Sequence, residues 1–139
     1  MPITYHWNSE AKYLMVITFE GTWTWDDFHN QIKDIHKEIE IVSHTADMLL
    51  WHKVAQPLGN PLIHFNSAAR QQPANTGMVI VVAPPYNSAA ISFLLSLSSI
   101  VRKIYPTKSV VTIVMSLAEA EKLLGKKVDT RISLPVMER

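Results

Sequence analysis

The chain has 139 residues, of which 47% are hydrophobic and 18% charged, and its formal net charge is +1. This length and composition predict one globular domain over residues 1–139, and the balanced charge gives no indication of a nucleic-acid partner. Because cysteine is absent, disulfides, thiol nucleophiles and thiolate metal sites are excluded, which fits a location in the reducing cytoplasm.

Two strand-like segments open the chain, at Ile3–Trp7 and Tyr13–Glu20, and both are rich in β-branched and aromatic residues. The residues between them, NSEAK at positions 8–12, favour a turn, so the pair predicts an antiparallel hairpin. The second segment is apolar on both of its alternating faces, which predicts a place inside the sheet.

An amphipathic helix is predicted after the hairpin, ending near Ser43. Thr24 has the pattern of its N-cap, and Asp27 stands three residues later in the position of a capping box. Four apolar residues at helical spacing predict the face that packs on the sheet. They are Phe28, Ile32, Ile35 and Ile39.

The middle of the chain alternates strands with a helix. A short apolar run predicts a strand at Asp47–His52, and Asn60 followed by proline predicts the start of a helix that ends at Gln71. The segment Met78–Ala83 is apolar at six successive positions. Such a run indicates a strand covered on both faces, so we expect it in the middle of the sheet.

A further helix is predicted over residues 88–105, and it is apolar around most of its circumference except for a stripe of serines. It is too short and too polar to cross a bilayer, which takes roughly 20 apolar residues. One sheet face cannot cover so wide an apolar arc. A second copy of the chain is the commonest cover, and the alternatives are a ligand, the loop Lys53–Gly59 or the chain's own C-terminal tail. The residues expected in this homodimer interface are Phe93, Leu97, Ile100 and Ile104.

The last elements are a strand at Ser109–Met115 and a helix that begins after Ser116, with Glu119 completing a capping box and Gly125 at its end. The tail from Val128 to Arg139 has no clear periodicity, and we expect it to be partly mobile. The core should therefore span about residues 3–125. The order β-β-α-β-α-β-α-β-α predicts an α/β fold with a mixed, mostly parallel sheet.

This order, together with the phrases FEGTWTWDDF, TGMVIVVAP and SLAEAEKLL, resembles the STAS domain. STAS domains are the fold of bacterial anti-sigma-factor antagonists and of the cytoplasmic modules of sulfate transporters. The resemblance implies a regulatory protein-binding module. Regulatory members carry a phosphorylatable serine or threonine in the loop after the third strand. The corresponding residues 51–60, WHKVAQPLGN, contain neither, so the chain is similar to a divergent member without that phosphorylation site.

The histidines are the remaining candidates for chemistry. His29 and His36 lie two turns apart on one helix, about 10 Å at 1.5 Å per residue, so one metal ion cannot bind both, and we interpret them as surface residues. His52 ends a strand and His64 lies near the start of the next helix. That edge of an α/β sheet favours ligand sites, and the pair could bind an anion or move a proton, although a structural role for His52 is the simpler interpretation.

Among the tryptophans, Trp23 in the strand-to-helix turn is expected to be the most exposed and thus available to a ligand or partner. His52, His64, Asn60 and Trp23 are accordingly the candidate binding residues. We expect no metal and no cofactor. The predicted function is a non-catalytic, homodimeric regulatory or scaffolding module. The alternatives are a carrier of a small apolar ligand or lipid and, less favoured, an enzyme that uses His52 or His64.

Overall fold

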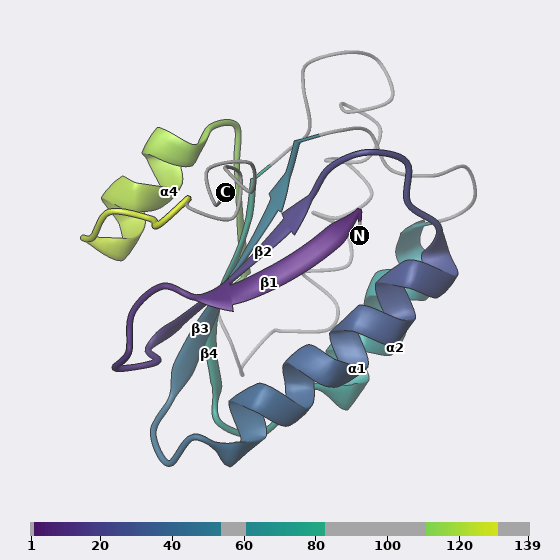
Figure 1. The fold of residues 1–139 in the computed structure, drawn as a ribbon, viewed down its shortest axis with the longest axis horizontal. Helices are drawn as coiled ribbons and strands as arrows, with labels where there is room; N and C mark the ends of the chain where they lie inside the picture. The colour runs from purple at the N-terminus through teal and green to yellow at the C-terminus, as the bar shows by residue number, and fades with distance from the viewer. Residues whose placement is uncertain (1, 54–60, 83–110, 131–139) are drawn as a thin grey trace, which may run out of the picture.

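A computed structural model describes residues 2–53, 61–82 and 111–130. Within them the fold is α/β, with a five-stranded mixed sheet and three helices (Figure 1). The strands are β1 (Ile3–Trp7), β2 (Leu14–Phe19), β3 (Ala46–His52), β4 (Thr76–Val82) and β5 (Val111–Val114). The helices are α1 (Trp25–Ile41), α2 (Pro61–Gln71) and α4 (Leu117–Leu124).

The strands lie in the sheet in the order β1-β2-β3-β4-β5, which is also their order along the chain. β1 pairs antiparallel with β2, and every other neighbouring pair is parallel. The predicted hairpin and the internal position of β2 are therefore confirmed. β4 is internal and buried from Val79 to Val82, but the middle strand is β3. The expected central placement of Met78–Ala83 was wrong, because each connection advances the sheet by one strand.

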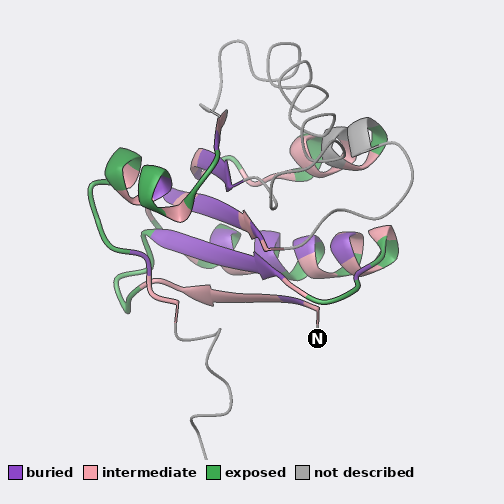
Figure 2. Cartoon of the chain, turned by 90° about the horizontal axis from the view of Figure 1, so that it is seen from above, coloured by how far each residue is buried: buried purple, intermediate pink, exposed green. Residues whose placement is uncertain are grey.

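Two apolar layers cover the sheet, one on each face (Figure 2). α1 and α2 lie on one face, where alternate residues of β2 and β3 such as Ile17 and Leu50 join the larger core. α4 lies on the other face, where Val16 and Leu49 belong to the second core. Strands with apolar residues on both faces need exactly this kind of double cover, since water would otherwise contact one apolar face.

α1 begins as the sequence predicts. The Thr24 hydroxyl accepts a hydrogen bond from the Asp27 amide at 3.0 Å, and the Asp27 carboxylate accepts one from the Thr24 amide at 2.9 Å, which completes the capping box. The predicted inner face is buried. His36 is buried as well, with 8% of its surface exposed, so its interpretation as a surface residue was wrong. Position 36 lies one turn after Ile32 and one turn before Ile39, within the arc that faces the sheet.

The end of α1 is tied to the start of β4 by one side chain. The Asn75 amide nitrogen donates to the backbone oxygens of Ile39, Val42 and His44 at 2.8, 3.1 and 3.0 Å. The Ile39 carbonyl also accepts the capping hydrogen bond from the Val42 amide at 3.1 Å, so both contacts meet at the last turn of the helix. Asn75 therefore fixes where α1 stops relative to the sheet.

A second tie joins β3 to β4 where their pairing register shifts. The Asp47 carboxylate accepts a hydrogen bond from the Met78 amide at 2.8 Å. Gly77 lies directly beside it. A Cβ at this position would come within 2.7 Å of the Thr45 methyl group and closer still to the Asp47 carboxylate. Glycine is required here by close approach, not by an unusual φ angle.

α4 has the predicted N-cap Ser116, and Gly125 ends it in the left-handed conformation with φ 70°. The second hydrogen bond of the predicted capping box is shifted by one residue. The Glu119 carboxylate accepts from the Met115 amide at 2.9 Å, not from the amide of the N-cap Ser116. The segment that follows is held in place. Val128 is buried, and the Asp129 amide donates to the Asn8 side chain. These contacts tie Val128 and Asp129 to the rest of the chain, and the expectation that the tail is partly mobile stays a prediction.

Several predictions lie outside the described residues. They concern Asn60, the tail beyond Thr130, and the helix expected at 88–105 with its interface residues Phe93, Leu97, Ile100 and Ile104. Among the helices that the structure does describe, none is long and apolar enough to cross a membrane.

We predict that Gly77→Ala lowers the free energy of unfolding by about 1–3 kcal/mol, the usual cost of forcing an extra carbon into a packed site. The matched control is Gly125→Ala, where a Cβ meets nothing within 4 Å and only the positive φ opposes the change. Urea denaturation of both variants makes the comparison. If Gly77→Ala lowered the free energy of unfolding no more than Gly125→Ala does, the close contact between position 77 and Asp47 would be absent.

Candidate functional site

The candidate site lies where the parallel strands β2 and β3 end. Their last residues, Phe19 and His52, are register partners on neighbouring strands, and both side chains point to the face that carries α1 and α2. The N-terminus of α1 lies at the same edge (Figure 1). Ligands of α/β sheets bind at this carboxyl edge, which makes it the first place to look for function.

His52 is part of the protein interior. Only 1% of its surface is exposed, and its imidazole stacks on the Phe19 ring with centroids 4.1 Å apart and an interplanar angle of 7°. Burial lowers the pKa of His52 to about 3, although hydrogen bonds with the backbone at Leu50 and Val82 oppose the shift. His52 is therefore neutral at pH 7, and it lies beneath other rings rather than at the surface.

Trp23 is one of the rings that cover His52. It is 3% exposed, so the expectation that it is the most exposed tryptophan was wrong. Its ring centroid lies 4.9 Å from that of Phe19 and 6.0 Å from that of His52. The strand-to-helix turn folds this side chain back over the ends of β2 and β3, which buries it. We name Phe19, Trp23, Phe28 and His52 the edge cluster.

Trp25, the first residue of α1, continues the series of rings outward. It makes an edge contact with Trp23 at 5.1 Å and another with Phe28 at 5.6 Å. On its far side the His64 imidazole stacks on the Trp25 indole, with centroids 4.2 Å apart and an interplanar angle of 7°. Trp25 and His64 are both only half-buried. The contact joins the first turn of α1 to the start of α2.

His29 completes the arrangement from the next turn of α1. Its Nε2 atom is hydrogen bonded to Nδ1 of His64 at 2.8 Å. The pKa of His64 is lowered, first by desolvation and then by the neighbouring His29, while Asp26 opposes the shift. We name Trp25, His29 and His64 the ring corner, because they form the partly exposed end of the series.

His52 and His64, which the sequence analysis proposed as a pair, are not in contact in the structure. In the series of rings, Trp23 and Trp25 stand between His52 and His64. The partner of His64 is His29, which is 35 residues away in the chain. No spacing rule connects positions that far apart. The sequence indicated His29 only by its position in the first turns of the predicted helix, whose start lies at the same edge of the sheet.

The chemistry open to the ring corner follows from these contacts. A neutral histidine offers one donor and one acceptor, and here one nitrogen of each ring is already used in the His29–His64 bond. Within the described part of the chain, no group of three or more His, Asp or Glu side chains is arranged to hold a metal ion. The ring corner is thus an apolar, stacked surface with two remaining imidazole nitrogens.

The opposite face of the same edge carries a charged contact. The Lys53 ammonium lies 4.9 Å from the centroid of the Trp51 ring and 3.1 Å from the Glu20 carboxylate. Lys53 and Glu20 are partly exposed, so this pair contributes little to stability. Trp51, the strand residue before His52, faces the second core because successive side chains of a strand point to opposite faces.

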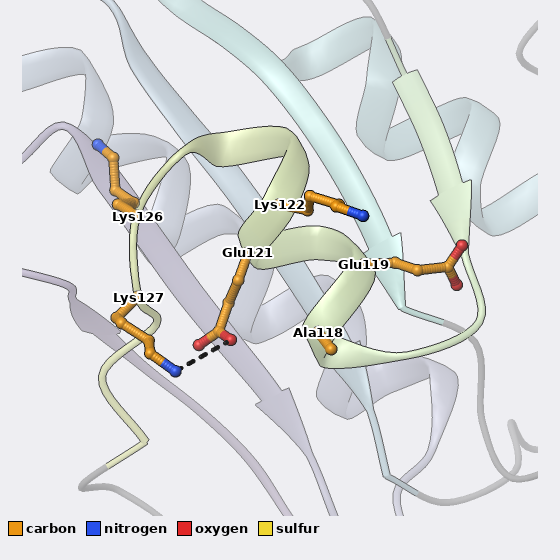
Figure 3. Close-up of a pocket in the computed structure, with 6 residues that line it drawn as sticks. All are labelled: Ala118, Glu119, Glu121, Lys122, Lys126 and Lys127. Atoms are coloured by element: carbon orange, nitrogen blue, oxygen red, sulfur yellow. Dashed lines mark ion pairs between the residues drawn. The ribbon is translucent and has the colours of Figure 1, made fainter.

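A shallow depression lies elsewhere, over α4 and the residues that follow it (Figure 3). Its lining is Ala118, Glu119, Glu121, Lys122, Lys126 and Lys127. The charged groups do not converge, since Lys126 and Lys122 point in different directions in Figure 3. The ion pair between Lys127 and Glu121 spans 3.9 Å, with Lys127 almost fully exposed. This depression lacks the converging polar groups of a ligand site.

Comparison of the chain with protein-family models, with curated proteins and with solved structures finds no match. The fold and the ring contacts are therefore the basis for any functional proposal.

We predict that the buried, neutral His52 makes stability fall in acid. The unfolded chain binds a proton at His52 near pH 6.5, whereas the folded chain binds it only near pH 3. Between these values the unfolded state holds more protons, so the free energy of unfolding decreases as the pH falls, by about 1.4 kcal/mol per pH unit for one such group.

Urea denaturation between pH 7.5 and 4.5 tests this on the wild type and on His52→Phe, which keeps a ring against Phe19 without a titrating group. As the pH falls, the free energy of unfolding should decrease more steeply for the wild type than for His52→Phe. Burial also lowers the pKa of His36, and this adds the same pH dependence to the free energy of unfolding of both proteins. Parallel curves would mean that His52 is protonated in the folded protein.

Proposed function

We propose that the protein is a non-catalytic regulatory or scaffolding module of the STAS type, which acts in the cytoplasm by binding a protein partner. The proposed recognition surface is the ring corner, Trp25, His29 and His64. The observation that carries the proposal is the stack of Trp25 and His64, half-buried at the carboxyl edge of the sheet. Tryptophan is among the residues that most often dominate binding energy at protein interfaces.

Packing behind the ring corner supports a binding surface. Trp25 rests on Trp23 and Phe28, which are themselves buried. A ring supported from behind loses little conformational freedom when a partner covers its exposed part, which favours affinity. The capping box at Thr24 and Asp27 fixes the first turn of α1 and with it the backbone that carries Trp25.

The same contacts favour binding over acid–base catalysis. Of the two histidines that the sequence singled out, His52 is buried under Trp23 and Phe19. The other, His64, uses one nitrogen for His29 and its ring face for Trp25. A general base must reach the proton it removes. His52 is too deep for that role, and His64 is held by two neighbours.

We predict that Trp25→Ala weakens partner binding at least tenfold, since hot-spot residues each contribute about 2 kcal/mol or more. The partner is first recovered by cross-linking to the tagged chain in the cells in which it occurs, then produced pure and titrated by calorimetry. His64→Ala should weaken binding as well. The matched control is Ile63→Ala, a neighbouring residue that is 64% exposed on α2, which should change affinity less than twofold.

Circular dichroism establishes that each variant is folded before titration. Equal affinities of wild type, Trp25→Ala and His64→Ala would exclude the ring corner as the recognition surface. A purified chain that turns over a substrate, with loss of turnover in His64→Ala, would instead favour the enzyme. A native mass spectrum of the untreated protein addresses the carrier alternative, because a bound small apolar ligand would add its own mass.

The expected homodimer has a separate test. Leu97→Asp should shift the protein from dimer to monomer in sedimentation velocity at micromolar concentration, because it would place a charge within the proposed apolar interface of Phe93, Leu97, Ile100 and Ile104. Ile63→Asp, which adds the same charge at an exposed position, should leave the dimer intact. A wild-type monomer at this concentration with no bound ligand would refute the interface.

A further inference from the structure

We propose that the hydrogen bond between His29 and His64 is an acid-sensitive latch, which holds the start of α2 against Trp25 and opens when both histidines are protonated. The latch would regulate the ring corner, so its biological role rests on the proposed function. The opening itself is a property of the chain alone and can be measured without a partner.

The latch is defined by two contacts of one side chain. His64 bonds through Nδ1 to His29 at 2.8 Å, and its ring face stacks on Trp25 at 4.2 Å. Both partners belong to α1, whereas His64 belongs to α2. His64 therefore connects the two helices at the carboxyl edge of the sheet, and moving its ring away uncovers the outer face of Trp25.

Counting protons shows when the contact can persist. Two neutral imidazoles supply one N–H donor and one acceptor to the bond, and a pair with one added proton still does so. In the doubly protonated pair every ring nitrogen is a donor, so the bond has no acceptor. Two positive rings would then face each other with centroids 5.0 Å apart, and their repulsion adds to the loss of the bond. The bond is therefore lost when both nitrogens of both rings carry protons, and this opens the latch.

The neighbouring charges set the pH range. Asp26 on α1 favours protonation of His64, whereas desolvation and His29 disfavour it, so that the pKa of His64 lies below its ordinary value of 6.5. Lys33 lies one turn after His29 on α1 and is exposed. The other residues of α2 before Arg70, and residues 54–60 before the helix, contain no ionisable side chain. At the sheet edge, His52 lies behind Trp23 and Trp25 in the series of rings and stays neutral until about pH 3, and Glu20 and Lys53 form their ion pair on the opposite face. The latch should open below pH 6.5.

The test follows the exposure of Trp25 in the whole chain labelled with 5-fluorotryptophan. The fluorine signal of Trp25 is assigned by its loss in Trp25→Phe. Its shift between light and heavy water, which grows with solvent exposure, is measured from pH 7.5 to 4.5, and far-ultraviolet circular dichroism follows the fold. The wild type should show an increase in the Trp25 solvent shift with a midpoint below pH 6.5, at constant circular dichroism.

Two variants separate the latch from general effects of acid. His29→Gln keeps an amide that can bond to His64 but removes the second charge, and His64→Phe keeps a ring on Trp25 without any charge. Both should hold the Trp25 solvent shift constant over the range. The latch is refuted by a constant shift in the wild type, by the same increase in His29→Gln, or by an increase that appears only as the circular dichroism is lost.

Discussion

The structure depends on strands that are apolar on both faces. β2 places Ile17 in one core and Val16 in the other, and β3 does the same with Leu50 and Leu49. Neither face of such a sheet can be left to water, because each buried aliphatic side chain contributes about 1.5–3 kcal/mol. The double layer of helices follows from this requirement. The ends of the strands need a cover too, and at the carboxyl edge aromatic rings supply it.

The aromatic cover links the core to the proposed binding surface. From His52 the ring contacts pass through the edge cluster to Trp25 and on to His64, with no step longer than 6.0 Å between centroids. The inner histidine is neutral because it is buried, and the outer pair is held by a hydrogen bond that has no acceptor once both rings are protonated. One set of contacts thus positions the half-buried Trp25, and in the proposed latch the same contacts would make its surroundings sensitive to acid.

Local signals in the sequence predicted most of the described elements. The Thr24–Asp27 capping box, the hairpin turn and Gly125 each act within a few residues, so their effect is visible in the chain itself. The arc of α1 could also have revealed the burial of His36, because helical spacing places it beside Ile32. By contrast, Trp23 is buried by Phe19 and His52, which meet it only after the strands have assembled.

The site was harder to predict for the same reason. The bond between His29 and His64 joins two helices across 35 positions, and the hydrogen bond from Asp129 to Asn8 joins the segment after α4 to the turn after β1 across 121. Periodicity carries no information on such contacts. They depend on the order of strands in the sheet, which decides which helix lies beside which, and the sequence pattern left that order open.

The most direct test of this account is the proton NMR spectrum of the ring corner at pH 7.5. Parallel rings with centroids 4.2 Å apart place the His64 ring protons in the shielded region above the Trp25 indole. The account predicts upfield-shifted His64 resonances with nuclear Overhauser effects to the indole protons, and loss of the shielding in Trp25→Ala. Resonances of His64 at the positions of a solvent-exposed imidazole, without effects to Trp25, would contradict it.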